Sequence, residues 1–258
     1  GSVAKYIATS TLEAGLDVKS MAETSTKVFI LEVMGRHAGW IAAASCLAAT
    51  KAGDPPHIIL LPEVPFEKTK FVTQVKQTVK EQGYCVIVAS EGTQAKNGKF
   101  LADSGLTDAF GHKQLGGVAP VLAGMISKIG LKNHWAVADY LQRSARHIAS
   151  KTDLDQAYAV GEHAVKLAIA GKTALMPIIK RTSDSPYKWK IATAPLKNVA
   201  NIEKTMPKKF ISKNGFEITQ AGKTYLRPLI KGEAAIKYVN GLPDVAELKK
   251  IKVKKKLS

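Results

Sequence analysis

The sequence has little cysteine and no long apolar stretch. Its longest apolar runs, near residues 58–62 and 85–89, fall far short of the roughly 20 residues that a transmembrane helix needs. Its two cysteines, Cys46 and Cys85, lie among apolar residues and lack the spacing of a metal site or a redox pair. No secretory signal is recognisable either. We therefore expect a cytoplasmic protein with buried, unreactive thiols and no membrane partner.

Acidic residues are also scarce. The chain has 21 Asp and Glu against 38 Lys and Arg, which gives a net charge of +17. Such an excess attracts polyanions, whether nucleic acid, a phospholipid surface or phosphorylated metabolites. The closing LKKIKVKKKLS is more typical of a solvated tail than of a site. Aromatic residues are not interleaved with the basic ones, which argues against a nucleic-acid groove.

Strand-like and helix-like apolar patterns alternate along the first part of the chain. Strands are predicted where branched apolar residues run together, and helices where apolar residues recur at helical spacing. The predicted order is strand 27–33, helix 39–53, strand 57–62, helix 65–83, strand 84–92, loop 93–117, helix 118–130 and strand 134–140. The polar loop is long enough to be functional. The alternation predicts an α/β fold with a parallel sheet flanked by helices.

Polar residues follow three of these strands. Arg36 comes just after the first, Glu91 stands at the end of the third, and Tyr140 and Arg143 follow the last. Ligands of parallel sheets gather at the carboxyl ends of the strands. Gly35 would let the backbone approach such a ligand, and the planar fork of an arginine suits a phosphate group. The sequence therefore predicts an anion-binding crevice at this edge.

The pattern changes beyond residue 150. Thr152 and Asp155 are spaced as a capping box at the start of a helical stretch. Two strands with a Ser-Asp-Ser-Pro turn between them predict a hairpin, and the remainder is rich in proline and irregular. We divide the chain into an α/β domain, residues 1–150, and a second part, residues 151–258, with a helix, the hairpin and an irregular C-terminal extension.

Four stretches resemble the phosphofructokinase family. They are EVMGRHAGWIAA from residue 32, VASEG from residue 88, YLQR at residues 140–143, and the late run APLKNVANIEKTMPKKFI with YLRPLIKGE. The first and third are specific to the family at this spacing, and the late run points to its pyrophosphate-dependent bacterial branch. The likeness covers essentially the whole chain. It implies a three-layer α/β/α fold in which residues 1–150 bind the sugar phosphate and part of residues 151–258 packs on an N-terminal donor-binding domain.

The resemblance assigns a substrate role to the segment that follows the first strand. Met34, Gly35 and Arg36 would bind fructose 6-phosphate, and Arg36 would also stabilise charge on the transferring phosphoryl group. The residues alone leave a second interpretation open, in which Arg36 simply pairs with an acid at a helix start.

The other implied contacts come from later strand ends. Glu91 would accept a hydrogen bond from a sugar hydroxyl, although a glutamate before a glycine is also an ordinary loop residue. Arg143 would bind the 6-phosphate, and Tyr140 begins the same substrate-binding segment; three residues apart, the two can face one ligand. Arg146 and His147 lie close in sequence but cannot be aligned with the family's further basic positions.

Lys27 opens the first predicted strand, and His37 follows it. The family has an arginine in the place of Lys27, which would reach the 6-phosphate bound by a neighbouring subunit; lysine keeps the charge but loses the fork. A strand-opening lysine is equally an ordinary surface residue. His37 is assigned no proton transfer, since the resemblance gives it none. His57, His112, His134, His147 and His163 have no zinc spacing, and no metal ligand is predicted.

Phosphoryl transfer also needs a base for the hydroxyl proton, a cradle for the donor phosphates and usually magnesium held by carboxylates. In the family a glycine-rich loop and a Thr-Ile-Asp motif supply these, and neither pattern occurs in this sequence. The chain also opens inside a helical apolar pattern without a methionine. We therefore expect the C-terminal portion of an enzyme, inactive alone, in which the catalytic base and the ligands of Mg²⁺ lie outside these residues.

The expected enzyme transfers phosphate from pyrophosphate to the 1-hydroxyl of fructose 6-phosphate, giving fructose 1,6-bisphosphate in glycolysis. A homo-oligomer is expected, with no nucleic-acid partner. Two alternatives stay open: ATP as the phosphate donor, or a non-enzymatic basic module that binds polyanions.

Overall fold

The computed structural model describes residues 1–107, 113–115 and 117–252. The helices are α1 (Ser2–Met21), α2 (Trp40–Ala44), α3 (Lys68–Gln82), α4 (Val118–Ser127), α5 (Leu141–Ser144), α6 (Lys151–Ile169) and α7 (Gln220–Leu226). Short 3₁₀ helices are η1 (Ser45–Ala48), η2 (Arg146–Ile148), η3 (Leu196–Asn198), η4 (Lys208–Phe210) and η5 (Arg227–Ile230). The strands are β1 (Val28–Val33), β2 (Ile58–Leu60), β3 (Cys85–Ser90), β4 (Asp103–Thr107), β5 (Lys113–Leu115), β6 (Asn133–Val137), β7 (Leu175–Asp184), β8 (Tyr187–Pro195), β9 (Tyr238–Val239) and β10 (Leu242–Pro243).

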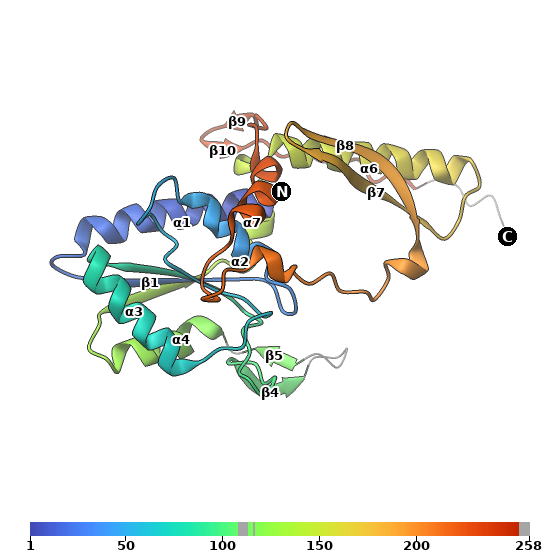
Figure 1. Ribbon diagram of the computed structural model, residues 1–258. Helices are drawn as coiled ribbons and strands as arrows, with labels where there is room; N and C mark the ends of the chain where they lie inside the picture. The colour runs from blue at the N-terminus through green and yellow to red at the C-terminus, as the bar shows by residue number, and fades with distance from the viewer. Residues whose placement is uncertain (108–112, 116, 253–258) are drawn as a thin grey trace.

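The central sheet has four strands in the order β2-β3-β1-β6, all parallel (Figure 1). Val33 at the end of β1 lies opposite Ser90 at the end of β3, and Glu32 lies opposite Val137 at the end of β6. The carboxyl ends of these three strands therefore meet at one edge of the sheet, as the sequence predicted.

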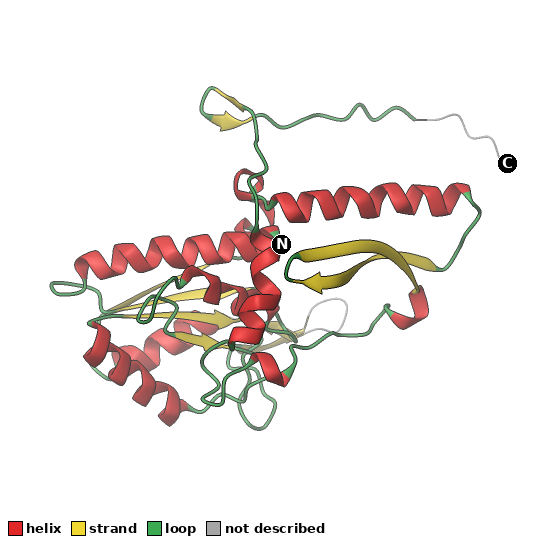
Figure 2. Ribbon diagram, turned by 45° about the horizontal axis from the view of Figure 1, so that its top comes forward, coloured by secondary structure: helices red, strands yellow, loops and turns green. Residues whose placement is uncertain are grey.

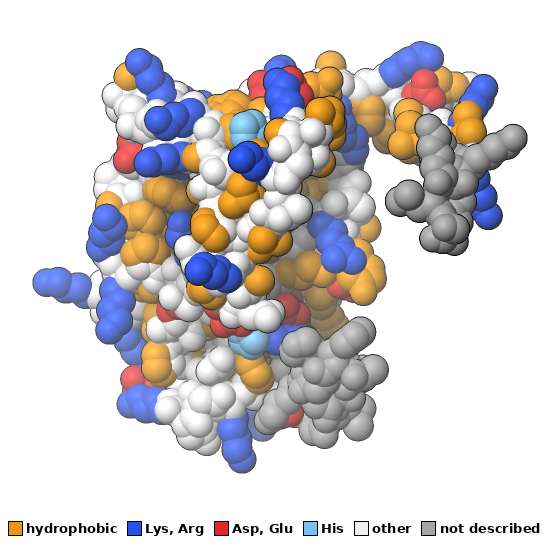
Figure 3. Space-filling view, turned by 90° about the vertical axis from the view of Figure 1, so that its right-hand side faces the viewer, with side chains coloured by type: hydrophobic (Ala, Val, Ile, Leu, Met, Phe, Trp, Pro, Cys, Tyr) orange, Lys and Arg blue, Asp and Glu red, His pale blue; other side chains and the backbone are white. Residues whose placement is uncertain are grey.

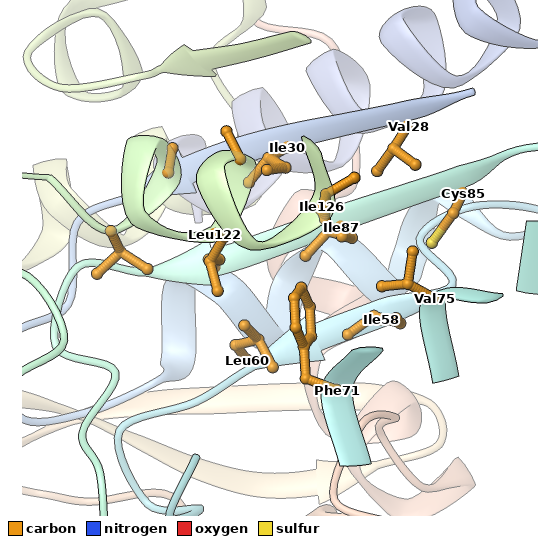
Figure 4. Close-up of a cluster of buried hydrophobic side chains, with 14 of the residues drawn as sticks. Val28, Ile30, Ile58, Leu60, Phe71, Val75, Cys85, Ile87, Leu122 and Ile126 are labelled. Carbon is orange, nitrogen blue, oxygen red and sulfur yellow. The ribbon is translucent and has the colours of Figure 1, made fainter. Parts of the chain in front are cut away.

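Helices cover both faces of this sheet. On one face α3 and α4 pack through Phe71 and Leu122 against Ile30 and Ile87 of the central strands (Figure 4). On the other face α1, α2 and α7 pack against β1 and β3. Burying each large apolar side chain contributes about 1.5–3 kcal/mol, so both layers hold the strands in place. The predicted α/β class with a parallel sheet is confirmed.

Helix α3 shows how directly some of the sequence dictates structure. Phe71 and Val75 face the core, and Val72 and Val79 pack partly buried beside them, as their helical spacing predicts. Gly83 ends the helix with φ of 83°, and its N–H donates to the carbonyl of Val79 at 2.9 Å. Only glycine adopts this left-handed conformation without cost, so the helix ends where the sequence places it.

The predicted helix over residues 39–53 is wrong in length. The α-helix ends at Ala44, and η1 carries the turn only to Ala48. The carboxylate of Asp54 accepts hydrogen bonds from the N–H groups of Thr50 and Lys51, both at 3.0 Å. Those N–H groups would have to face preceding carbonyls in a helix, so the local turn replaces it.

The predicted loop 93–117 is also partly wrong, because it contains the antiparallel pair β4 and β5. Residues 108–112 and 116 of that prediction, and residues 253–258 of the basic tail, lie outside the described residues.

Beyond residue 150 the chain forms the predicted long helix and hairpin. The N-cap of helix α6 is Ser150 and not Thr152. Ser150 Oγ accepts the N–H of Asp153 at 3.3 Å, so the predicted capping box that starts at Thr152 is wrong. Ser150 Oγ also lies within hydrogen-bonding distance of the carbonyls of Leu229 and Lys231, at 2.7 and 3.1 Å. These contacts with residues far along the chain favour Ser150 over Thr152 as the N-cap.

The hairpin β7–β8 is antiparallel and lies beside α6, away from the central sheet (Figure 2). The later chain then returns to the sheet, where Met206, Phe210 and Leu226 enter the apolar layer around α1 and α2. The division into residues 1–150 and 151–258 stays a prediction, since residues from both parts share this layer. In the described residues, no helix combines the length and apolar character needed to cross a bilayer.

Candidate functional site

The loop that follows β1, residues 34–39, is the centre of the candidate site. Gly35 has φ of 138°, a conformation that favours glycine. Gly92 lies directly against this loop, since a Cβ on it would come within 1.8 Å of the carbonyl oxygen of Arg36. The glycine pair therefore lets the ends of β1 and β3 approach each other closely, and it fixes the backbone that carries Arg36.

Side chains from the two neighbouring strand ends hold the start of this loop. Glu91, just after β3, accepts a hydrogen bond from the N–H of Gly35 at 3.1 Å. Gln142, in α5 after β6, accepts one from the N–H of Met34 at 3.3 Å. Glu91 and Gln142 thus join three separate strand ends through the backbone of the loop, and Gln142 is a member that the sequence prediction missed.

The end of the loop is held by Glu63, which follows β2. Its carboxylate accepts the N–H of Gly39 at 3.0 Å and the N–H of Met206 at 2.8 Å. Glu63 therefore bridges the loop to the segment that returns from the hairpin. No local sequence pattern marks this role, because the partners of Glu63 are far apart along the chain.

Residues 203–206 lie across the loop. The Nδ1 of His37 lies within hydrogen-bonding distance of the carboxylate of Glu203, and the indole N–H of Trp40 donates to the carbonyl of Lys204 at 2.7 Å. His37 thus has a partner on the surface, and its exclusion from proton transfer stays a prediction.

Arg36 is half-buried and its charge is not used within the described residues. Its Nε is buried without a hydrogen-bond partner, and no carboxylate of the described part pairs with it. The alternative interpretation, an ion pair at a helix start, has no acidic partner among the described residues. A buried donor without a partner costs about 1–3 kcal/mol, which an anionic ligand would recover.

Tyr140 and Arg143 interact with each other at the start of α5. The guanidinium carbon of Arg143 lies 4.3 Å from the centre of the Tyr140 ring, and both residues are exposed. Arg143 also lines a cavity of about 240 Å³ together with Arg146, Ser2 and Asp153. Arg36 and Glu91 do not line this cavity. The structure therefore links the two halves of the candidate site through Gln142 and does not merge them into one closed pocket.

Arg146 has other partners. Its guanidinium donates to the carbonyls of Ala234 and Ala235, at 2.9 and 3.5 Å, so it fastens the C-terminal segment to η2. His147 is exposed.

Lys27 lies at the opposite end of β1, as predicted. Its Nζ donates to the carbonyl of Ala22, which closes the turn after α1. Its contact with a neighbouring subunit stays a prediction.

Glu32 is a buried carboxylate inside β1 that the sequence prediction passed over. Its Oε2 accepts the N–H of Ala119 at 2.8 Å, at the start of α4. Burial raises the pKa of Glu32, and the charges of Glu91 and Asp139 raise it further against the lowering effect of the backbone N–H groups. The position of Glu32 as an acidic residue in an otherwise apolar strand is the sequence feature that could have pointed to it.

A magnesium site would need several carboxylates or other ligand side chains close together. Within the described part of the chain, no three His, Cys, Asp or Glu residues gather so as to hold a metal ion. The described residues therefore do not fit the metal that the resemblance implies. His112 lies outside the described residues.

Comparison with known proteins identifies relatives of this chain. The chain is 63% identical over 258 residues to the pyrophosphate–fructose 6-phosphate 1-phosphotransferase of Halomonas elongata, and 56% identical over 259 residues to the protein of that name from Methylococcus capsulatus. It superposes on the crystal structure of a pyrophosphate-dependent phosphofructokinase from Marinobacter aquaeolei with a TM-score of 0.88 and 58% identity. All of this chain is covered in each comparison, and it spans 62% of each relative's length.

The family model described as phosphofructokinase matches residues 8–168, which include β1, the loop after it, β3, α5 and most of α6. These are the elements that carry the network around Arg36. The chain belongs to the phosphofructokinase family.

Proposed function

We propose that this chain forms the fructose 6-phosphate-binding part of an enzyme that phosphorylates the sugar at its 1-hydroxyl with pyrophosphate, giving fructose 1,6-bisphosphate in glycolysis. The observation that carries the proposal is the guanidinium of Arg36, half-buried and without an acidic partner among the described residues. It stands on a loop that Glu91 holds by the N–H of Gly35. An anionic substrate would complete this arrangement.

Each side chain of the network has a distinct part. Arg36 would bind the substrate and stabilise the negative charge of the phosphoryl group as it transfers. Glu91 uses Oε1 on the loop, and its remaining acceptor capacity suits a sugar hydroxyl. Arg143, with its guanidinium stacked on Tyr140, would hold the 6-phosphate. The proton of the 1-hydroxyl must pass to a base, and no residue of this chain is assigned that role.

The donor is proposed from the relatives. Both curated proteins named above carry pyrophosphate in their names, at 63% and 56% identity. We prefer pyrophosphate over ATP on this ground. Magnesium would be held by residues outside those described here, and the free, buried thiols agree with a cytoplasmic protein.

The rival interpretation is a basic module that binds polyanions. On the face that Figure 3 shows, Lys and Arg side chains are scattered among uncharged groups and do not form one continuous patch. A polyanion-binding surface would need clustered charge along one stripe. On this face the arrangement therefore favours a small phosphorylated ligand.

Calorimetry with fructose 6-phosphate separates the two functions. We expect Arg36→Ala and Arg143→Ala to abolish measurable binding, while removal of residues 249–258 changes it little. Arg227→Ala is the matched control, because Arg227 is an exposed arginine outside the network. Loss of binding on removing the tail, with a steep dependence on salt, would instead support the polyanion module. Pyrophosphate-dependent turnover by the purified chain would overturn the assignment of the base and donor site to other residues.

A further inference from the structure

Gln142 is buried in a segment whose other side chains face outward. Its exposed fraction is 2%, whereas Tyr140 and Leu141 on the same turn are 62% and 63% exposed. A glutamine is rarely so buried unless both ends of its amide are bonded. The burial therefore directs attention to its partners.

Both ends of the amide are bonded to backbone groups of the site. Oε1 accepts the N–H of Met34 at 3.3 Å, and Nε2 donates to the carbonyl of Asp139 at 2.8 Å. Asp139 has φ of 36°, in the left-handed region that residues other than glycine seldom adopt. One side chain thus holds the loop after β1 and an unfavourable bend after β6 at the same time.

This pair of bonds can be made only by a group with a donor and an acceptor at the right distance. A carboxylate accepts but does not donate, and a methionine of similar length does neither. An ionised carboxylate here would also face the carbonyl of Asp139 without a hydrogen between them. Glutamine is therefore specified at this position by the two backbone groups, and not by packing alone.

We propose that Gln142 is a positioning residue that fixes the segment of Tyr140 and Arg143 relative to the loop of Arg36, so that both arginines meet one sugar phosphate. It acts through its hydrogen bonds to the backbone of Met34 and Asp139. This inference rests on the proposed function, and it adds the residue that joins the two halves of the site.

The first test is binding of fructose 6-phosphate to Gln142→Met. Removing both hydrogen bonds should weaken the affinity for fructose 6-phosphate about tenfold or more, because Arg36 and Arg143 are no longer held in fixed positions relative to each other. Gln156→Met is the matched control: Gln156 is 5% exposed, and its Nε2 donates to Tyr187 Oη at 2.7 Å and not to the loop after β1. It should lower stability without changing the affinity. An affinity of Gln142→Met equal to that of the unchanged chain would overturn the proposal.

The second test uses pH and serves even where Gln142→Met does not fold. A protonated glutamic acid has one O–H donor and one acceptor, as the amide does, whereas its anion has no donor. Gln142→Glu should therefore bind like the unchanged chain at low pH and lose affinity as the pH rises through the raised pKa of the buried acid. The ratio of the two affinities at each pH removes the titration of the sugar phosphate itself. A ratio independent of pH would contradict the proposal.

The rate of hydrogen exchange at the Met34 amide measures the hydrogen bond between Met34 and Gln142 without any ligand. Exchange should be faster in Gln142→Met and unchanged in Gln156→Met. If the unchanged chain does not bind fructose 6-phosphate, the proposed function is wrong. Faster exchange at Met34 in Gln142→Met would still support the role of Gln142 in positioning the loop. Unchanged exchange at Met34 counts against the positioning whatever the ligand.

Discussion

The carboxylate of Glu91 accepts the N–H of Gly35 at 3.1 Å and so joins the end of β3 to the end of β1. This contact makes Glu91 a structural residue as well as a candidate ligand. Variants that separate the two roles are available, because glutamine can still accept the N–H but carries no charge.

Glu91→Gln should keep the stability of the chain and weaken fructose 6-phosphate binding about tenfold, since a neutral acceptor binds a hydroxyl less strongly than a carboxylate. Glu91→Ala should also lower the free energy of unfolding by about 1 kcal/mol or more, because the Gly35 N–H loses its partner. Chemical denaturation and calorimetry on both variants test this. Equal binding by Glu91→Gln and the unchanged chain would mean that Glu91 is structural only.

The stacking of Arg143 on Tyr140 yields a second prediction. The cation–π contact at an exposed site is worth about 0.5–1 kcal/mol, and it holds the guanidinium toward the ligand. Tyr140→Leu should therefore weaken sugar-phosphate binding about threefold. Tyr140→Phe is the matched control and should bind normally, because the ring is kept. If both variants bind normally, the stacking does not position Arg143.

Stability should depend on pH through Glu32. Burial raises its pKa in the folded state, so the folded chain binds its proton more tightly than the unfolded chain. Neutral Glu32 therefore contributes favourably to the free energy of unfolding. This contribution is fully present below the pKa of Glu32 in the unfolded chain, and it is lost as the pH rises through the pKa of Glu32 in the folded chain. Glu32→Gln cannot ionise, so its stability relative to the unchanged chain should increase over this range. Denaturation from about pH 4 to pH 8 measures the difference, and a constant or falling difference would contradict it.

The strands and α3 could be predicted because their signals are local. Branched apolar residues in succession mark a buried strand, and the spacing of Phe71 and Val75 with a closing Gly83 marks a helix and its end. The shared edge of Arg36, Glu91 and Arg143 followed from the parallel topology alone.

The contacts that hold the site could not be predicted in the same way. Gln142 and Met34 are 108 residues apart, and Glu63 and Met206 are 143 apart, so no local pattern marks either pair. The choice of Ser150 as a helix cap depended likewise on the carbonyl of Leu229. Local signals determine elements, whereas these bonds exist only once the elements are assembled.

Both thiols should be inert in the folded chain. Burial raises the pKa of Cys46 to about 12 and that of Cys85 even more strongly. The thiolate is the reactive form, and at pH 8 it is scarce at Cys46. A thiol reagent should therefore label neither residue until the chain unfolds, when it labels both. Stoichiometric labelling of the folded chain would contradict the burial of these residues.

The outer face of α6 should drive self-association. Tyr158 and Ile169 are 78% and 83% exposed, and apolar faces of this kind are normally covered by another surface. Tyr158→Lys with Ile169→Lys should therefore lower the apparent mass in sedimentation experiments at high protein concentration, without changing stability. Thr73→Lys is the control, since it adds a charge at an exposed position of α3. If the double variant sediments like the unchanged chain, α6 is not the surface through which copies associate.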